Sequence, residues 1–77
     1  MNNVIPQQVT QVTEETLLGK EARVFKDEFS PEAIGRIERV RGCGSLQAVE
    51  IRIYPNQPGP RVRVAFVGQW ELTGGLG

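Results

Sequence analysis

The stretch VEIRIYPNQPGPRVRVAFV, residues 49–67, decides the fold because two alternating segments flank a loop that contains three prolines. Apolar and polar side chains alternate in Val49–Ile53 and again in Arg61–Phe66, which is the two-residue period of a half-buried strand. Pro58-Gly59 suits the centre of a type II turn, because proline fixes the first φ and glycine accepts the positive second one. This stretch therefore predicts a β-hairpin.

The hairpin also predicts which side chains are buried. We expect the valines, the isoleucines and the phenylalanine to line the interior and the arginines to face water. With two apolar positions from the preceding segments, the expected core is Val24, Ile37, Val49, Ile51, Ile53, Val62, Val64 and Phe66.

Before the hairpin, GKEARVF places Ala22 and Val24 in alternation with charged residues, which predicts another half-buried strand. Further upstream, residues 13–15 predict a short helical turn that Gly19 ends, because threonine caps exposed amides and glycine suits a helix end.

Residues 31–41 are ambiguous. Ser30-Pro31 resembles a helix start, and Ile34, Ile37 and Val40 recur every three residues, as on one face of a helix. Gly35 weakens a helix interior by about 1 kcal/mol, and a glycine that enters a strand after one helical turn fits equally well. The fold class is thus mainly β, a small antiparallel sheet or partly open barrel with one helical turn. The alternative is α+β, with a helix over 31–41 packed on the hairpin.

The size and composition exclude several protein classes. The chain has 77 residues, one cysteine and no histidine. A disulfide-stapled scaffold and a zinc site are therefore not expected, and one core of this size supplies only about 3 to 5 kcal/mol. We expect a single domain over 14–72, a flexible arm over 1–13 and a flexible end over 73–77. The N-terminus resembles no signal peptide and no segment matches a membrane span, so a cytoplasmic protein is expected.

The order GKEARVF, AIGRIERV and RVRVAFVGQWEL resembles small SH3-like barrels of the KOW type over residues 17–72. The matching positions are Gly19, Val24, Gly35, Ile37, Val40, Val64, Phe66 and Trp70. The resemblance implies a binding module, because that fold commonly docks RNA, ribosomal or redox partners. The SPEA segment and the proline-rich loop depart from the family's pattern.

No catalytic set can be assembled from this sequence. Without histidine, Cys43 and the serines have no imidazole activator. The GCGS stretch lacks the lysine of a phosphate-binding loop, and the adjacent acidic pairs would point to opposite faces of an extended segment. We therefore predict a protein that is not an enzyme and needs no cofactor or metal.

The charges are neutral overall but unevenly distributed. Residues 1–32 carry three basic and six acidic groups, whereas residues 33–77 carry six arginines and three glutamates. This asymmetry fits either a basic binding face or two halves that complement each other. The candidate binding residues are Arg36, Arg39, Arg41, Arg52, Tyr54, Arg61, Arg63 and Trp70.

These residues suggest two functions. The preferred one is a small accessory protein that acts through protein–protein interaction, within a larger assembly or as a homo-oligomer, since a small core gains from extra burial. The alternative is RNA or DNA binding through the same arginines. Tyr54 is the main candidate for base stacking, because Phe66 and Trp70 are expected inside.

Overall fold

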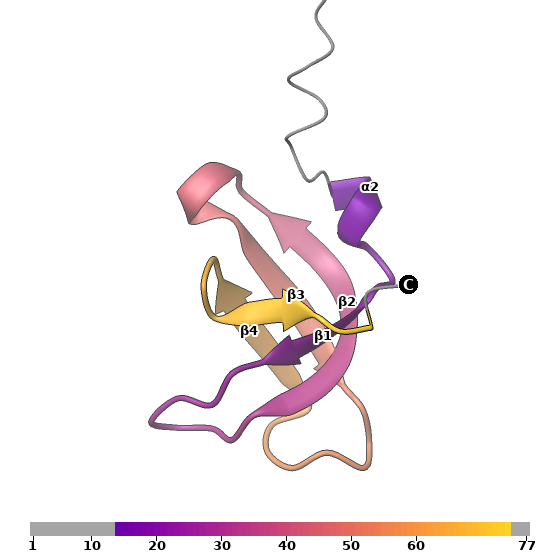
Figure 1. Cartoon of the computed structure of the whole chain (residues 1–77), viewed down its shortest axis with the longest axis vertical. Helices are drawn as coiled ribbons and strands as arrows, with labels where there is room; N and C mark the ends of the chain where they lie inside the picture. Colours follow the sequence, from indigo (N-terminus) through magenta and orange to yellow (C-terminus); the bar gives the residue numbers. More distant parts are fainter. Residues whose placement is uncertain (1–13, 75–77) are drawn as a thin grey trace, which may run out of the picture.

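The structure is a computed structural model that describes residues 14–74, and β-strands dominate this part of the chain (Figure 1). One helical turn, α2, covers Glu14–Leu17. A short 3₁₀ turn, Gly44–Leu46, lies between the second and third strands. The strands are β1 Glu21–Val24, β2 Ala33–Arg41, β3 Ala48–Ile53, β4 Val62–Phe66 and β5 Trp70–Leu72. The expectation of a mainly β fold with one helical turn is confirmed.

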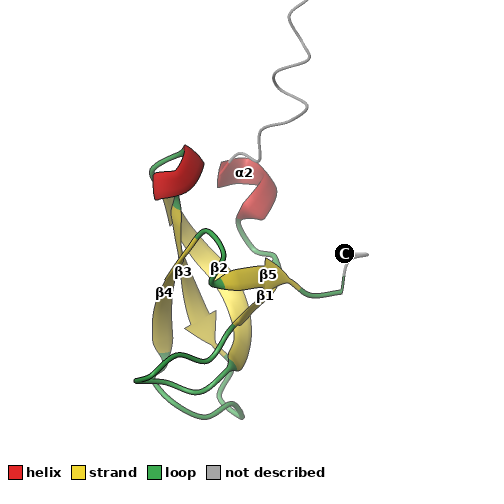
Figure 2. Cartoon of the chain, turned by 60° about the vertical axis from the view of Figure 1, so that its left-hand side comes forward, coloured by secondary structure: helices red, strands yellow, loops and turns green. Residues whose placement is uncertain are grey.

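The five described strands form one antiparallel sheet in the order β4-β3-β2-β1-β5. Because β4 and β5 are consecutive in the chain yet lie at opposite edges, the turn between them can join the two edges only if the sheet curls (Figure 2). The amide N–H of Phe25, just after β1, donates to the carbonyl of Gln69 in that turn at 3.0 Å. The result is a curled, open sheet with one inner and one outer face.

The long strand β2 pairs with β1 on one side and with β3 on the other, and it needs a glycine where the three strands meet. Gly35 lies opposite Ala22 and Ile53. A Cβ at this position would lie 2.2 Å from the carbonyl oxygen of Arg52, which is far inside van der Waals contact. No other residue type fits without moving the β3 backbone.

The alternative of a helix over 31–41 is wrong, because residues 33–41 are strand β2. The pairing of β2 with β3 shifts register between Ile37 and Arg39, which is the signature of a β-bulge. The extra residue places Ile37 and Val40 on the same buried face despite their three-residue spacing. The bulge therefore produces the step from Ile37 to Val40, whereas Ile34 alternates with the buried residues and lies on the opposite face.

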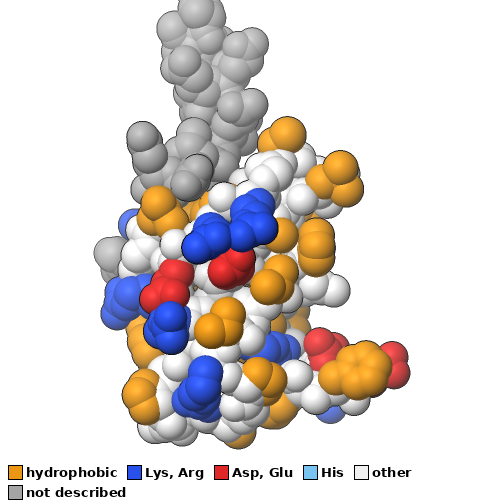
Figure 3. All heavy atoms as spheres, turned by 180° about the vertical axis from the view of Figure 1, so that it is seen from behind, with side chains coloured by type: hydrophobic (Ala, Val, Ile, Leu, Met, Phe, Trp, Pro, Cys, Tyr) orange, Lys and Arg blue, Asp and Glu red, His pale blue; other side chains and the backbone are white. Residues whose placement is uncertain are grey.

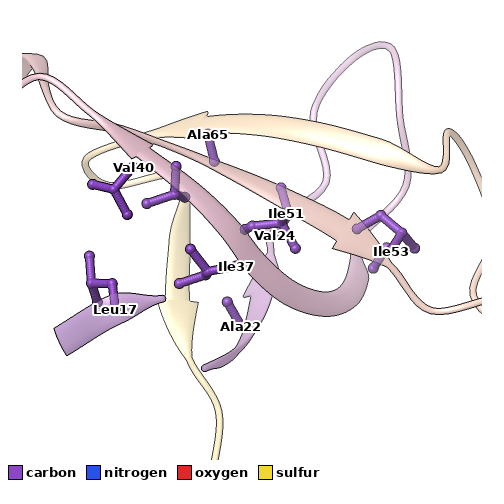
Figure 4. Packing of buried hydrophobic residues seen from close by; sticks show 10 residues of the cluster. Leu17, Ala22, Val24, Ile37, Val40, Ile51, Ile53 and Ala65 are labelled. Atoms are coloured by element: carbon purple, nitrogen blue, oxygen red, sulfur yellow. The ribbon is translucent and has the colours of Figure 1, made fainter. Parts of the chain in front are cut away.

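The core lies inside the curl of the sheet, where α2 contributes Leu17 and each of β1 to β4 contributes small or branched side chains (Figure 4). Val24, Ile37, Val49, Ile51 and Ile53 are buried, as predicted. The buried apolar residues that were not in the predicted core are Leu17, Ala22, Ala33, Val40 and Ala65. Trp70 is half-buried and packs against this cluster.

The prediction for β4 is wrong in its facing, although the hairpin itself is confirmed. Val62, Val64 and Phe66 are exposed, with 45%, 56% and 47% of their surface accessible, while Arg63 and Ala65 point inward. The reason is register: Arg63 lies opposite Ile51 and Ala65 opposite Val49, and directly opposed residues share a face. A one-residue slip reverses every side chain of a strand.

The turns follow the glycines and prolines. Gly19 ends α2 with a φ of +84°, as its position predicts, and Gly59 adopts a φ of +87°, as expected in a type II turn. The loop's backbone hydrogen bond lies earlier, where the Gln57 N–H donates to the Tyr54 carbonyl at 3.0 Å. Thr73 in the expected C-terminal end bonds to Glu21. The expected arm over 1–13 and the end over 75–77 lie outside the described residues.

Gly35→Ala is expected to destabilise the fold by about 1 to 3 kcal/mol, because the new methyl group collides with the β3 backbone. Urea unfolding followed by circular dichroism measures the loss. Gly68→Ala is the control: its φ of +91° is strained for alanine, but its Cβ would meet nothing within 4 Å. A smaller loss in Gly35→Ala than in Gly68→Ala would contradict the close approach of β2 and β3.

Candidate binding surface

The exposed side of β4 carries an apolar stripe. Val62, Val64 and Phe66 alternate along the strand, and Val67, which follows in the turn, is 58% exposed. Seen from behind, hydrophobic side chains gather beside a group of arginine and acidic side chains on this face (Figure 3). We call Val62, Val64, Phe66 and Val67, with the free edge of β4, the β4 surface.

The edge of β4 is also open at the backbone. The N–H of Ile53 donates to the carbonyl of Arg61 at 2.8 Å, so the groups that face β3 belong to residues 61, 63 and 65 by the alternation of an antiparallel ladder. Those of Val62 and Val64 point away from the sheet and have no partner among the described residues. Phe66 is different, because Gln69 bonds both its N–H and its carbonyl at 2.9 Å. The open edge thus consists of two residues, Val62 and Val64, whose backbone groups are free to pair with another strand.

Arg63 holds β4 in this orientation. Its side chain is 7% exposed and lies under the β1–β2 loop. There Nη1 donates to the Pro31 carbonyl at 2.6 Å and Nη2 to the Phe25 carbonyl at 3.3 Å. The carboxylate of Asp27 lies 3.8 Å from Nη2. A residue proposed as a contact for partners is therefore committed to the interior of the protein.

Asp27 organises the same loop. Its Oδ1 accepts hydrogen bonds from the backbone N–H groups of Phe29 and Ser30, both at 2.8 Å. These two bonds, followed by the charge of Arg63, stabilise the ionised carboxylate and lower the pKa of Asp27.

Two further candidates, Arg39 and Arg41, share one acidic partner. Glu50 of β3 lies 3.9 Å from Nε of Arg39 and 3.4 Å from Nη2 of Arg41. Glu50 is directly opposite Val64 on β4, so this charged group borders the apolar stripe. Glu50 therefore neutralises part of the positive charge of Arg39 and Arg41 within the protein.

Four of the eight candidates come together around an open hollow of about 590 Å³. We call it the arginine hollow, and its lining residues are Arg36, Glu38, Arg52, Ile53, Tyr54, Pro55 and Arg61. The guanidinium of Arg36 lies 5.8 Å from the centre of the Tyr54 ring, within cation–π distance. Nε of Arg52 donates to Glu38 at 2.8 Å. The lining residues thus include three cations and one anion, and the carboxylate of Glu21, which interacts with Arg36, lies beside them.

The other contacts of the arginine hollow fix its walls. Arg61 donates to the carbonyls of Tyr54 and Gly59 at 3.0 Å, and also to that of Gln57, so it closes the proline-rich loop. The Tyr54 hydroxyl donates to Glu21 at 3.0 Å. Partial burial and this hydrogen bond raise the pKa of Tyr54.

Four residues that line the hollow are thus predicted from the sequence as binding residues, whereas their meeting there and the apolar stripe are not. Arg36, Arg52, Tyr54 and Arg61 are brought together, Arg39 and Arg41 lie beside Glu50, and Arg63 and Trp70 face the interior. The valines of β4 carry no local signal of exposure. Their face depends on the pairing register, in which Val62 lies opposite Arg52 rather than Ile53, and the contacts of Arg63 favour this register.

Comparisons with protein-family models, curated proteins and solved structures found no match to this chain. Within the described residues, no group of three or more metal-ligating side chains is present. In the same part of the chain, no helix is long and apolar enough to cross a membrane.

Arg63→Met is expected to lower the free energy of unfolding by about 2 kcal/mol, because the loop carbonyls lose a charged donor in a buried site. Urea denaturation measures the change. Arg39→Met is the matched control, since its side chain is 58% exposed, and we expect a change within about 0.5 kcal/mol. Equal effects of the two substitutions would contradict the structural role of Arg63.

Acidification is expected to destabilise the loop through Asp27. Because the folded-state pKa of Asp27 lies below its ordinary value of 3.8, its contribution to stability is fully present above that value. It disappears as the pH falls through the lower folded-state pKa. Unfolding midpoints between about pH 6 and pH 2 should therefore fall less in Asp27→Asn than in the parent protein. Parallel curves for both proteins would contradict this assignment.

Proposed function

We propose that this chain is a small non-enzymatic accessory protein that acts through protein–protein interaction, with the β4 surface as its contact. The single observation that carries the proposal is that β4 exposes apolar side chains and free backbone groups of Val62 and Val64 on the same edge strand. Edge strands are usually protected by charges, proline or a covering segment. Exposed apolar patches commonly mark interaction sites.

The competing function, binding of RNA or DNA, has weaker support. A nucleic acid is bound by cations that follow its phosphates over several positions. On the outer face, Glu50 engages Arg39 and Arg41, and Glu38 engages Arg52. Tyr54, the candidate for base stacking, already has an arginine over one face of its ring.

Site-specific photo-crosslinking in cells that express the full chain tests the proposal. A crosslinking residue at Val64 should yield discrete protein adducts, because this position is at the centre of the β4 surface. The same residue at Leu46, which is 75% exposed in the 3₁₀ turn, is the control for random collision.

The proposal predicts adducts from Val64 that are absent from Leu46 and that disappear with an added Val62→Lys substitution. A lysine on the edge strand disfavours pairing with another strand. The same adducts from both positions, or nucleic acid as the main crosslinked species, would contradict the proposed function.

A further inference from the structure

We infer that the β4 surface binds an extended segment of a partner protein in which alternate residues are apolar and one acidic residue, beyond the apolar ones, enters the arginine hollow. This inference rests on the proposed function and adds the chemistry of the partner. An extended segment that joins a sheet edge obtains affinity from main-chain hydrogen bonds and specificity from alternate side chains.

The apolar stripe and the arginine hollow are continuous. Arg61 of the hollow directly precedes Val62 in the chain, and Arg52 lies opposite Val62 across the β3–β4 pair. Arg36 lies opposite Arg52 on β2. One row of the outer face therefore runs from Val62 across the sheet into the hollow. A strand paired with β4 would run at right angles to this row, beside Val62, and the first residue of the hollow that it meets beyond Val62 is Arg61.

The charge of the hollow specifies the acidic residue. Arg36 and Arg61 donate to neutral backbone carbonyls, and neither forms a salt bridge within the described residues. Arg52 uses Nε for Glu38, and its terminal nitrogens have no other partner in this part of the structure. A guanidinium carries five N–H donors and pairs well with a carboxylate. A single carboxylate would find unused donors here.

A second copy of this chain fits the surface less well. An antiparallel pair that satisfied Val62 and Val64 would place Val62 opposite Val64 of the other copy and Arg63 opposite Arg63. The two Arg63 side chains would stay inside their own copies, where Pro31 and Phe25 bind them, and so would not decide the pairing. The segment that would then approach the hollow is Val64 to Phe66, which contains no acidic residue. The charge distribution therefore favours a partner other than a second copy of this chain.

Labelled peptides test the inference directly. The probe is a heptapeptide in which valine alternates with threonine and glutamate ends the chain. It is made in both chain directions, so that antiparallel and parallel pairing with β4 are both tested. The matched control peptide has glutamine in place of glutamate. Fluorescence anisotropy with the full chain should show that glutamine weakens binding about tenfold.

Protein variants then locate the contact. Arg52→Gln should remove the preference for glutamate, whereas Arg39→Gln, an equally exposed arginine that lies outside the hollow, should retain it. Val64→Thr keeps the shape of the side chain and its strand propensity, and it should weaken binding of both peptides. Circular dichroism checks that each variant is folded.

The outcomes separate the two proposals. Equal affinity for the two peptides, with loss of binding in Val64→Thr, would overturn the acidic specificity and leave the proposed function standing. No binding of either peptide would overturn this inference, while the crosslinks from Val64 test the proposed function independently. Concentration-dependent dimerisation in sedimentation experiments that Val64→Thr abolishes would make a second copy the occupant and also overturn it.

Discussion

The buried guanidinium of Arg63 is the interaction on which the outer surface depends. It binds the carbonyls of Pro31 and Phe25, so β4 must turn its odd-numbered residues inward over the β1–β2 loop. Asp27 orders the same loop through the N–H groups of Phe29 and Ser30. Because strand side chains alternate, Val62, Val64 and Phe66 then have no place except the outside. The exposed stripe follows from where one polar side chain finds its acceptors.

The bulge in β2 similarly determines which side chains reach the arginine hollow. The register shift between Ile37 and Arg39 leaves Glu38 and Arg39 both exposed, so the two side chains reach different partners on β3. Glu38 bonds Arg52, while Arg39 approaches Glu50. Gly35 permits the close strand contact that precedes the bulge. The hollow and the neighbouring charged group are thus separated by one irregularity in one strand.

The sequence predicted the elements that local patterns control. Alternation gave the hairpin and β1, and Gly19 marked the end of α2. It could not predict the facing of β4, because alternation shows which side chains share a face but not which face is inside. The inner face is set by long-range contacts, those of Arg63 with Pro31 and Phe25. It also left 31–41 ambiguous, because the bulge gives Ile37 and Val40 the three-residue spacing of a helix face. The KOW-type resemblance stays a prediction.

The ion pairs that form on folding explain how a protein without net charge keeps a locally positive site. Of its seven arginines, five form ion pairs with carboxylates within the described residues, including Arg63 with Asp27 and Arg23 with Glu71 of β5. Arg36 and Arg61 donate to backbone carbonyls instead, and both line the hollow beside the exposed end of β4. Most arginines are therefore paired on folding, although only the pair of Arg63 with Asp27 joins a basic group of residues 33–77 to an acidic group of residues 1–32. The positive charge of Arg36 and Arg61 remains without an ion pair in the described part of the chain and lies next to the apolar stripe. There, one acidic side chain of a bound strand would pair with it.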